Sequence, residues 1–177
     1  MQNEDALTTQ NLPLEPTILV ANLPYNISVP VLLHFLEKFP TIRSGVVMVQ
    51  SEVADRLVAK PGSKNYGSPS VKSTWWADLS GAGNVARQVF WPIPNVDSSL
   101  VRFVRHPAAG DEEQRGLTFS VIDAAFAQRR KMLRGALSQL FEGQAEAAIA
   151  KAGIDPTARG ETLLLGDFIR IARALAK

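Results

Sequence analysis

The feature that most constrains the fold is an apolar run that ends directly in a proline-containing turn. Residues 17–22 read TILVAN, a β-rich apolar stretch typical of a strand buried on both faces of a sheet. Leu23-Pro24-Tyr25 follows at once, with no polar spacer. Side chains at the carboxyl end of a buried strand project into the ligand crevice of an open α/β sheet. The sequence therefore predicts that Asn22-Leu23-Pro24-Tyr25 borders a binding site.

Strand and helix patterns alternate along the first part of the chain. Apolar residues between Pro30 and Phe39 recur at helical spacing, 46–50 reads as a second buried strand, and 52–59 as a short helix. This order predicts a parallel, doubly wound α/β sheet. Beyond it we expect a mobile loop at 60–70 and a helix at 70–76, with one of its two tryptophan rings turned inward. Strands at 84–90 and 98–105 are expected to end the sheet as an antiparallel hairpin.

The composition changes after His106. The stretch PAAGDEEQRG, 107–116, has the proline, glycine and charge content of a linker. Helical patterns then dominate, at 118–128, 130–141, 143–152 and 166–176. We therefore expect two domains, 1–106 of α/β type and 107–177 formed by the linker and a small all-helical domain.

Composition excludes several classes of protein. The 177 residues contain no cysteine and only two histidines, which excludes disulfides and thiolate metal sites and argues against a histidine metal cage. No apolar run approaches the roughly 20 residues of a membrane span, and the polar start shows no secretory signal. We expect a cytoplasmic, metal-free protein. The net charge of +2 is too mild to indicate a nucleic-acid partner by itself.

The turn at 22–25 carries groups suited to an aromatic amine. The Asn22 side-chain oxygen and the Leu23 carbonyl are hydrogen-bond acceptors, Pro24 stiffens the turn, and Tyr25 offers a face on which a base can stack. The alternative is an ordinary strand end with an asparagine-capped proline turn. A second motif, GAGNVA at 81–86, formally fits a dinucleotide fingerprint, but no clear strand precedes it and we interpret it as a mobile turn.

Three motifs in order resemble one family. VANLPYNIS, 20–28, is similar to the amine-methyltransferase motif of the rRNA adenine dimethyltransferases, a family that includes the erythromycin-resistance methylases. FWPIPNVDS, 90–98, looks like their signature Phe-x-Pro-x-Pro-x-Val-Asp-Ser. The segments 124–137 and 153–163 resemble the start of their C-terminal helical domain and the turn before its last helix.

The resemblance implies a fold, a reaction and a set of site residues. Residues 1–106 would be part of a Rossmann-like methyltransferase domain, and 107–177 would bind rRNA. Asn22, Leu23, Pro24 and Tyr25 would hold and polarise the target adenine, and Phe90 would stack on its other face. Asp5 matches the acidic residue that accepts a hydrogen bond from the adenine of S-adenosylmethionine, and Asn22 would also lie near the transferred methyl group.

A basic cluster in the second domain is the candidate RNA contact. Arg129, Arg130, Lys131 and Arg134 fall within six residues of a predicted helix, with Lys60, Lys64 and Lys72 as further candidates. Such residues bind phosphates without reading sequence. The alternative for the cluster is a solvated helix face.

The resemblance also implies a piece that this sequence does not show. The family's glycine-rich cofactor loop precedes the acidic residue, and only four residues precede Asp5. We expect a partial catalytic domain, impaired when alone, whose exposed sheet edge favours a non-native dimer. The expected reaction is dimethylation of adenine amines in small-subunit rRNA of an assembling ribosomal subunit. The alternatives are a large-subunit resistance enzyme and a non-catalytic RNA-binding assembly factor.

Overall fold

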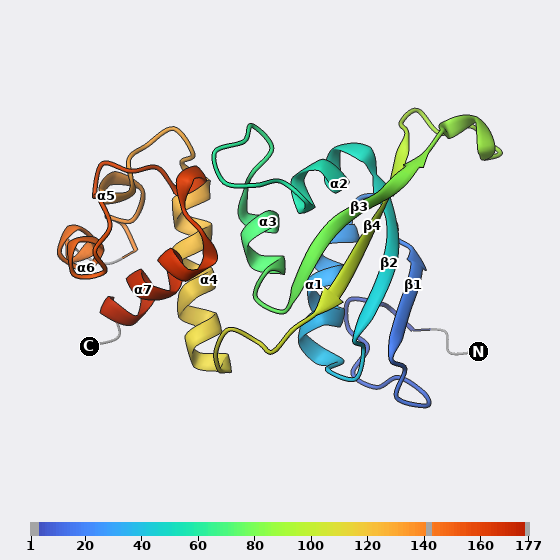
Figure 1. The fold of residues 1–177 in the computed structure, drawn as a ribbon, viewed down its shortest axis with the longest axis horizontal. Coiled ribbons are helices and arrows are strands. Elements are labelled where there is room, and N and C mark those ends of the chain that lie inside the picture. Colours follow the sequence, from blue (N-terminus) through green and yellow to red (C-terminus); the bar gives the residue numbers. More distant parts are fainter. Residues whose placement is uncertain (1–3, 141–142, 176–177) are drawn as a thin grey trace. The chain divides into compact units, whose positions relative to one another are not determined.

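The computed structural model describes residues 4–140 and 143–175, and the chain forms two compact units. The first unit combines residues 1–58 with 76–107, and the second combines 59–75 with 108–177. The segment 59–75 therefore folds with the helical part of the chain rather than with the sheet (Figure 1).

The first unit is built on a four-stranded mixed sheet in the order β1-β2-β4-β3. β1 (Ile18–Asn22) and β2 (Ser44–Gln50) are parallel, whereas β4 (Ser98–Arg105) is antiparallel to both β2 and β3 (Ala77–Val85). The helices of this unit are α1 (Ser28–Lys38) and α2 (Ser51–Leu57). The predicted strand–helix–strand–helix order and the closing antiparallel hairpin are both confirmed.

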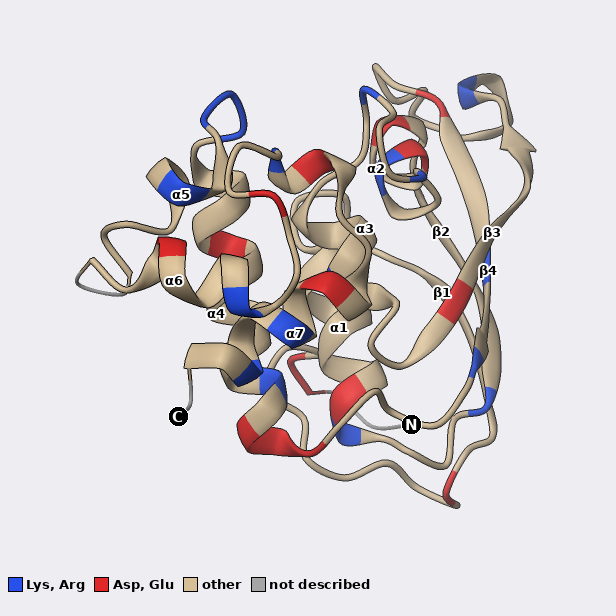
Figure 2. Cartoon of the chain, turned by 60° about the vertical axis from the view of Figure 1, so that its left-hand side comes forward, with Lys and Arg blue, Asp and Glu red and all other residues tan. Residues whose placement is uncertain are grey.

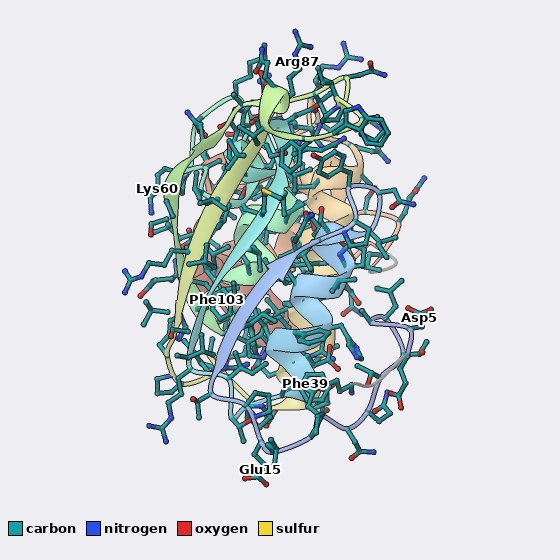
Figure 3. All side chains as sticks on the ribbon, turned by 90° about the vertical axis from the view of Figure 1, so that its right-hand side faces the viewer. Asp5, Glu15, Phe39, Lys60, Arg87 and Phe103 are labelled. Carbon is teal, nitrogen blue, oxygen red and sulfur yellow. The ribbon has the colours of Figure 1, made fainter. Side chains whose placement is uncertain are left out.

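One face of the sheet forms the core of this unit. Val47 pairs with Val101 and Gly45 with Phe103, and all four are buried on the same face. α1 lies against one face of the sheet in Figures 1 and 3, and its Val31, Leu32 and Leu36 are buried. Gly45 lets the Phe103 ring lie directly over the backbone, because a Cβ there would fall 2.6 Å from the ring.

The half-buried guanidinium of Arg105 holds the end of α1 to the sheet. Its Nε donates to the carbonyl oxygen of Ile42 at 2.8 Å, and its Nη2 donates to those of Leu36 and Phe39. Burial lowers the pKa of this guanidinium, and the carbonyl oxygens compensate its charge.

The prediction that β1 is buried on both faces was wrong. β1 is the edge strand, and alternate residues on its open face are exposed, Ile18 to 62% and Val20 to 79%. In the register of the sheet, Val20 lies beside Val46 and Val46 beside Arg102, so the open face crosses three strands. A local apolar pattern does not reveal whether a second layer covers the strand.

Three further predictions in the first half of the chain were wrong in detail. The helix expected at 70–76 is α3 (Ser68–Ser73), and Trp75 and Trp76 are both buried rather than one of them. The strand expected at 84–90 is the earlier β3, followed by a 3₁₀ turn at Arg87–Val89. The glycines expected in a mobile turn at 81–86 therefore lie in β3, with a register irregularity between Gly81 and Asn84, because pairing with β4 imposes an extended backbone.

The second unit is helical and has its own core. Its elements are α3, α4 (Glu112–Ala127), α5 (Leu133–Ala136), α6 (Ala145–Lys151) and α7 (Leu165–Leu175). Ile122, Leu137, Ile149, Phe168 and Ile171 are among its fully buried side chains.

α4 begins inside the segment that was expected to be a linker. The Asp111 carboxylate accepts a hydrogen bond from the Gln114 N–H at 2.8 Å, and Glu112 and Glu113 occupy the first turn. Carboxylates at these positions satisfy the free N–H groups of a helix start and complement its dipole. The acidic residues 111–113, whose charge suggested a linker, therefore stabilise the start of α4.

Candidate functional site

A pocket of about 420 Å³ lies at the carboxyl end of β1. One wall is Asn22, Leu23, Pro24 and Tyr25, and the other is Phe90, Trp91, Pro92 and Pro94. All five residues predicted to hold a base line this pocket, although they come from two distant segments of the sequence. The structure thus brings the candidate residues together, and their roles stay predictions.

The first wall is held by backbone hydrogen bonds that continue from β1. The Leu23 N–H donates to the Met48 carbonyl at 3.1 Å, which extends the pairing with β2 by one residue, and the Leu23 side chain is buried. The Ile27 N–H donates to the Pro24 carbonyl at 3.2 Å, and the Ser28 hydroxyl donates to the Tyr25 carbonyl at 3.3 Å. The turn is therefore rigid at both ends, and Asn22 remains exposed beside it.

The second wall is the loop between β3 and β4, at upper right in Figure 1. The Phe90 N–H donates to the Arg87 carbonyl at 3.2 Å, which closes the 3₁₀ turn just before Phe90. Phe90 is half-buried, whereas Trp91 is 94% exposed and precedes a cis peptide bond to Pro92. Sequence reasoning assigned no role to Trp91, although it stands in the same signature as Phe90.

The pocket offers acceptors and aromatic faces to a flat ligand. The Asn22 side-chain oxygen and the Leu23 carbonyl can accept hydrogen bonds, and Tyr25 and Phe90 contribute aromatic rings to the lining. Pockets of about 300–1,000 Å³ with a few polar groups on apolar walls are typical of small-molecule sites. A nucleobase with an exocyclic amine has the shape and the donors to match this lining.

Asp5 is not among the residues that line the pocket. It is exposed, its Oδ1 accepts a hydrogen bond from the Leu7 N–H at 2.9 Å, and its carbonyl accepts from the Thr8 and Thr9 N–H groups. In Figure 3, Asp5 lies beside α1, away from Arg87, which marks the base of the Phe90 loop. The carboxylate therefore organises the local turn, and its predicted contact with the adenine of S-adenosylmethionine stays a prediction.

The predicted basic helix is a turn. α4 ends at Ala127, residues 128–130 form a turn, and of the four predicted RNA contacts only Arg134 lies in a helix, α5 (Figure 2). Gln128 to Lys131 and Ala127 line a second pocket of about 370 Å³. The helical pattern fails here because the Leu133 N–H donates at 2.8 Å to the carbonyl of Ala158, a residue distant in sequence.

The four cations of this cluster differ in their surroundings. Arg129 Nε lies 2.8 Å from a Glu161 carboxylate oxygen, and Arg134 lies 3.9 Å from Glu146. Arg130 and Lys131 are exposed. Lys72, a further candidate, forms an ion pair with Asp123 and lies 5.0 Å from the centre of the Phe119 ring. Arg130 and Lys131 are therefore better placed for a phosphate than Arg129 or Lys72.

The loop expected to be mobile, 60–70, is fastened to its own unit. The Gly62 N–H donates to the Glu161 carbonyl at 2.7 Å, and the Tyr66 hydroxyl donates to the Leu163 carbonyl at 2.7 Å. Tyr66 is buried, and burial together with the negative charge of Asp167 raises its pKa to about 12.

The described part of the chain shows neither a metal cluster nor a membrane-spanning helix. Residues 4–140 and 143–175 contain no group of three or more histidine, aspartate or glutamate side chains that could hold a metal ion. None of the described helices has the length and apolar character needed to cross a bilayer.

Comparison with known proteins decides the family. Residues 2–177 match the family described as ribosomal RNA adenine dimethylase. The chain belongs to this family. A protein of Cutibacterium acnes named ribosomal RNA small subunit methyltransferase A is 58% identical over 181 aligned positions, covering 98% of this chain and 61% of the relative. The protein of that name from Leifsonia xyli is 56% identical, covering 96% of this chain and 62% of the relative. This member of the dimethylase family thus spans about three fifths of the length of these relatives.

Solved structures agree with the dimethylase fold. The 23S rRNA methyltransferase ErmE matches 99% of this chain and 71% of its own, with a TM-score of 0.66 at 24% identity. A dimethyladenosine transferase from Plasmodium falciparum matches 96% of this chain and 70% of its own, with a TM-score of 0.74 at 22% identity. The predicted Rossmann-like α/β class, followed by helices, is therefore confirmed.

Proposed function

We propose that this chain is the part of a small-subunit rRNA adenine dimethyltransferase that receives the target adenine. The reaction is the transfer of two methyl groups to the exocyclic amine of adenines in small-subunit rRNA. The supporting observation is that Asn22 to Tyr25 and Phe90, distant in sequence, line one pocket at the carboxyl end of a strand.

The chemistry of the pocket suits an adenine amine. The amine is a weak nucleophile because its lone pair is delocalised into the ring. Acceptors at the Asn22 side chain and the Leu23 carbonyl would take hydrogen bonds from the amine, which returns electron density to nitrogen as it attacks. Tyr25 and Phe90 would stack on a base that has left its helix, and this fixes the amine for attack.

S-adenosylmethionine is the methyl donor that the family implies, and the described residues fit it in part. Asn22 lies at the pocket, where an incoming methyl group would meet the amine. Asp5 would hold the adenine of the donor, as its place in the motif implies, although its Oδ1 already accepts the Leu7 N–H. When bound, S-adenosylmethionine supplies an electrophilic methyl group. The described residues orient the amine and supply acceptors for its protons.

The RNA would reach the second unit through phosphate contacts. Arg130 and Lys131 are exposed beside the pocket of about 370 Å³, and we assign them the main contacts. Arg134 would contribute at the edge, and Arg129 would mainly hold the turn in place. Phosphate contacts orient an RNA without reading its bases, so its folded shape would select the target.

The cellular setting is part of the proposal, and the names of the relatives support only the small-subunit rRNA. We place the reaction in the cytoplasm, on small-subunit rRNA within an assembling ribosomal subunit. The open edge of β1 is a site for unwanted pairing, and we expect the isolated chain to form a non-native dimer there.

A matched pair of asparagine variants tests the proposed function. Asn22→Ala removes the pocket amide, and Asn26→Ala removes an exposed amide that does not line the pocket. Both are made in a protein extended to the length of its relatives, with labelled S-adenosylmethionine and unmodified small subunits as substrates. Loss of one such polar group from an active site costs about 10²–10³ in rate. We expect that loss for Asn22→Ala with docking preserved, and near-normal methylation for Asn26→Ala.

Two outcomes would reject this function. Methylation by Asn22→Ala at the parental rate would remove Asn22 from the reaction. Docking without any methylation by the unsubstituted extended protein would favour the non-catalytic assembly factor. A calorimetric titration of S-adenosylmethionine into the present chain then shows whether the donor site survives in it.

A further inference from the structure

The Tyr25 wall of the pocket is fastened to the buried start of β4. Ser98 is fully buried, and it pairs in register with Gln50 of β2 and Val85 of β3. Its hydroxyl lies 2.7 Å from the Tyr25 hydroxyl. A residue with sheet neighbours on both sides cannot shift without breaking two ladders, so it is a rigid support for the tyrosine ring.

The preceding residue, Asp97, fastens the Phe90 wall. Its carboxylate accepts a hydrogen bond from the Arg87 N–H at 3.0 Å, at the first residue of the 3₁₀ turn that leads into Phe90. The Arg87 guanidinium donates to the Asn95 carbonyl at 3.2 Å, and the Asp97 carbonyl accepts from the Ser51 N–H at 3.0 Å. The loop that carries Phe90 is therefore closed at its base on Asp97.

We propose that Asp97 and Ser98 are positioning residues that together set the spacing between Tyr25 and Phe90, and hence the width of the slot that a nucleobase enters. The inference deepens the proposed function, because the slot is that of the proposed adenine site. Neither Asp97 nor Ser98 lines the pocket, so both act through the aromatic residues rather than on the base.

The physical reason is preorganisation. A tyrosine ring rotates about two side-chain bonds, and a base gains stacking energy only when the ring already lies at the right distance and tilt. A hydroxyl bond to a rigid strand removes that freedom before the ligand arrives, so the ligand does not bear the cost of ordering the ring. Asp97 and Ser98 are consecutive in one backbone segment, so the positions of the Phe90 wall and the Tyr25 wall are coupled.

The first test needs no ligand and uses the whole chain. Aromatic NMR spectra report the rotamer of Tyr25 through nuclear Overhauser contacts between its ring and residue 98. Ser98→Ala should leave the fold intact and give an averaged Tyr25 rotamer. The matched control is Ser99→Ala, since the Ser99 hydroxyl bonds to Ser51 and Asn84 and not to the pocket. A Tyr25 ring with unchanged contacts in Ser98→Ala would overturn the inference.

The Asp97 anchor has its own conservative pair. Asp97→Ala removes the acceptor of the Arg87 N–H, whereas Asp97→Asn keeps an oxygen in its place. We expect broadened Phe90 ring signals in Asp97→Ala and normal ones in Asp97→Asn. Equal Phe90 signals in Asp97→Ala and the parent chain would remove Asp97 from the inference.

The second test measures the bound base. A short single-stranded RNA that contains one adenine and a terminal fluorophore reports binding through fluorescence anisotropy, and the same RNA with an abasic residue in place of the adenine gives the binding that is due to the backbone alone. Ser98→Ala and Tyr25→Phe break the same bond from opposite ends, and each should raise the Kd roughly three- to tenfold, the value of one hydrogen bond. The double variant should bind no more weakly than either single variant, because the bond is removed only once.

The two proposals fail in different ways. A Kd for the adenine RNA that is the same in Ser98→Ala as in the parent chain would reject the positioning role and leave the adenine site standing. Equal binding of the adenine RNA and the abasic RNA by the parent chain would reject the adenine site in this chain, and the ring measurement would still decide whether Ser98 holds Tyr25.

Discussion

The Nε of Arg129 lies 2.8 Å from a carboxylate oxygen of Glu161, and an Nη of the same guanidinium donates to the Ser63 carbonyl at 3.2 Å. The Gly62 N–H donates to the carbonyl of the same glutamate at 2.7 Å. Three segments of the second unit, distant in sequence, therefore meet at one ion pair. The first cation of the basic cluster is a structural residue.

Arg129→Ala should destabilise the second unit. The change removes a charge-assisted hydrogen bond and one to a carbonyl, and because both side chains are partly exposed we expect a loss of about 1 kcal/mol in the free energy of unfolding. Arg130→Ala, at an exposed position, should change it by less than about 0.5 kcal/mol. Urea unfolding followed by circular dichroism measures both, and equal losses would contradict the distinction.

Substitution of Arg130 and Lys131 together by Ala should weaken RNA binding without loss of stability. Each phosphate-binding side chain that is removed should reduce the magnitude of the slope of log K against log salt by about 0.7–0.9, so the double variant should lose about twice that. Binding of a small-subunit rRNA fragment is measured at several salt concentrations. The control is Lys151→Ala, an exposed lysine in α6. An unchanged slope in the double variant would place the RNA elsewhere.

The second unit should lose stability in strong base because of Tyr66. Burial, aided by Asp167, raises the pKa of its hydroxyl from 10.0 to about 12, so the folded state favours the neutral phenol. The stabilisation is complete below the unfolded pKa and is lost as pH rises from about 10 to about 12. Tyr66→Phe also removes the bond to the Leu163 carbonyl, so it should be less stable at neutral pH.

The measurement for Tyr66 is unfolding of both proteins at a series of alkaline pH values. Lysine side chains lose protons in a similar pH range. Subtracting the free energy of unfolding of Tyr66→Phe from that of the parent chain at each pH removes their contribution and leaves that of Tyr66. If this difference in the free energy of unfolding stays constant between pH 10 and about pH 12, Tyr66 is not the titrating group.

Gly45→Ala should be strongly destabilising. A Cβ at this position would lie 2.3 Å from the Leu19 carbonyl oxygen and 2.6 Å from the Phe103 ring, so β1 or the core must shift. Overpacking of this kind costs about 1–3 kcal/mol. Gly81→Ala in β3 is the matched control, because its Cβ would meet nothing within 4 Å. Thermal unfolding compares the two, and similar melting temperatures would contradict the packing at Gly45.

Val20→Lys should reduce self-association of the isolated chain. Val20 is 79% exposed on the edge strand β1, whose residues Ile18–Asn22 include no charge to oppose pairing with another strand. Val104→Lys adds the same charge to β4, an internal strand, and should have less effect. Sedimentation velocity over a range of concentrations reports the dimer, and equal association of all three proteins would rule out the β1 edge.

Local patterns were sufficient wherever the determinants were local. The β-rich run before Asn22 predicted β1, because β-branched residues favour strands. The apolar spacing from Val31 to Phe39 predicted α1, because a single buried face imposes its own period on a helix. The order of the motifs predicted the family and five lining residues of the pocket. The residues of each motif are consecutive in the chain, so the motif can be recognised from the sequence alone.

Tertiary contacts decided the rest. The turn at 128–131 replaces the predicted helix because Leu133 bonds to the backbone of Ala158, and β3 begins early because β4 offers it a partner. Exposure of Val20 depends on which layers cover the sheet. The anchors Ser98 and Asp97 act across the fold on Tyr25 and Arg87. Hydrogen bonds and burial between distant residues depend on the path of the chain through space, and a local pattern does not contain that path.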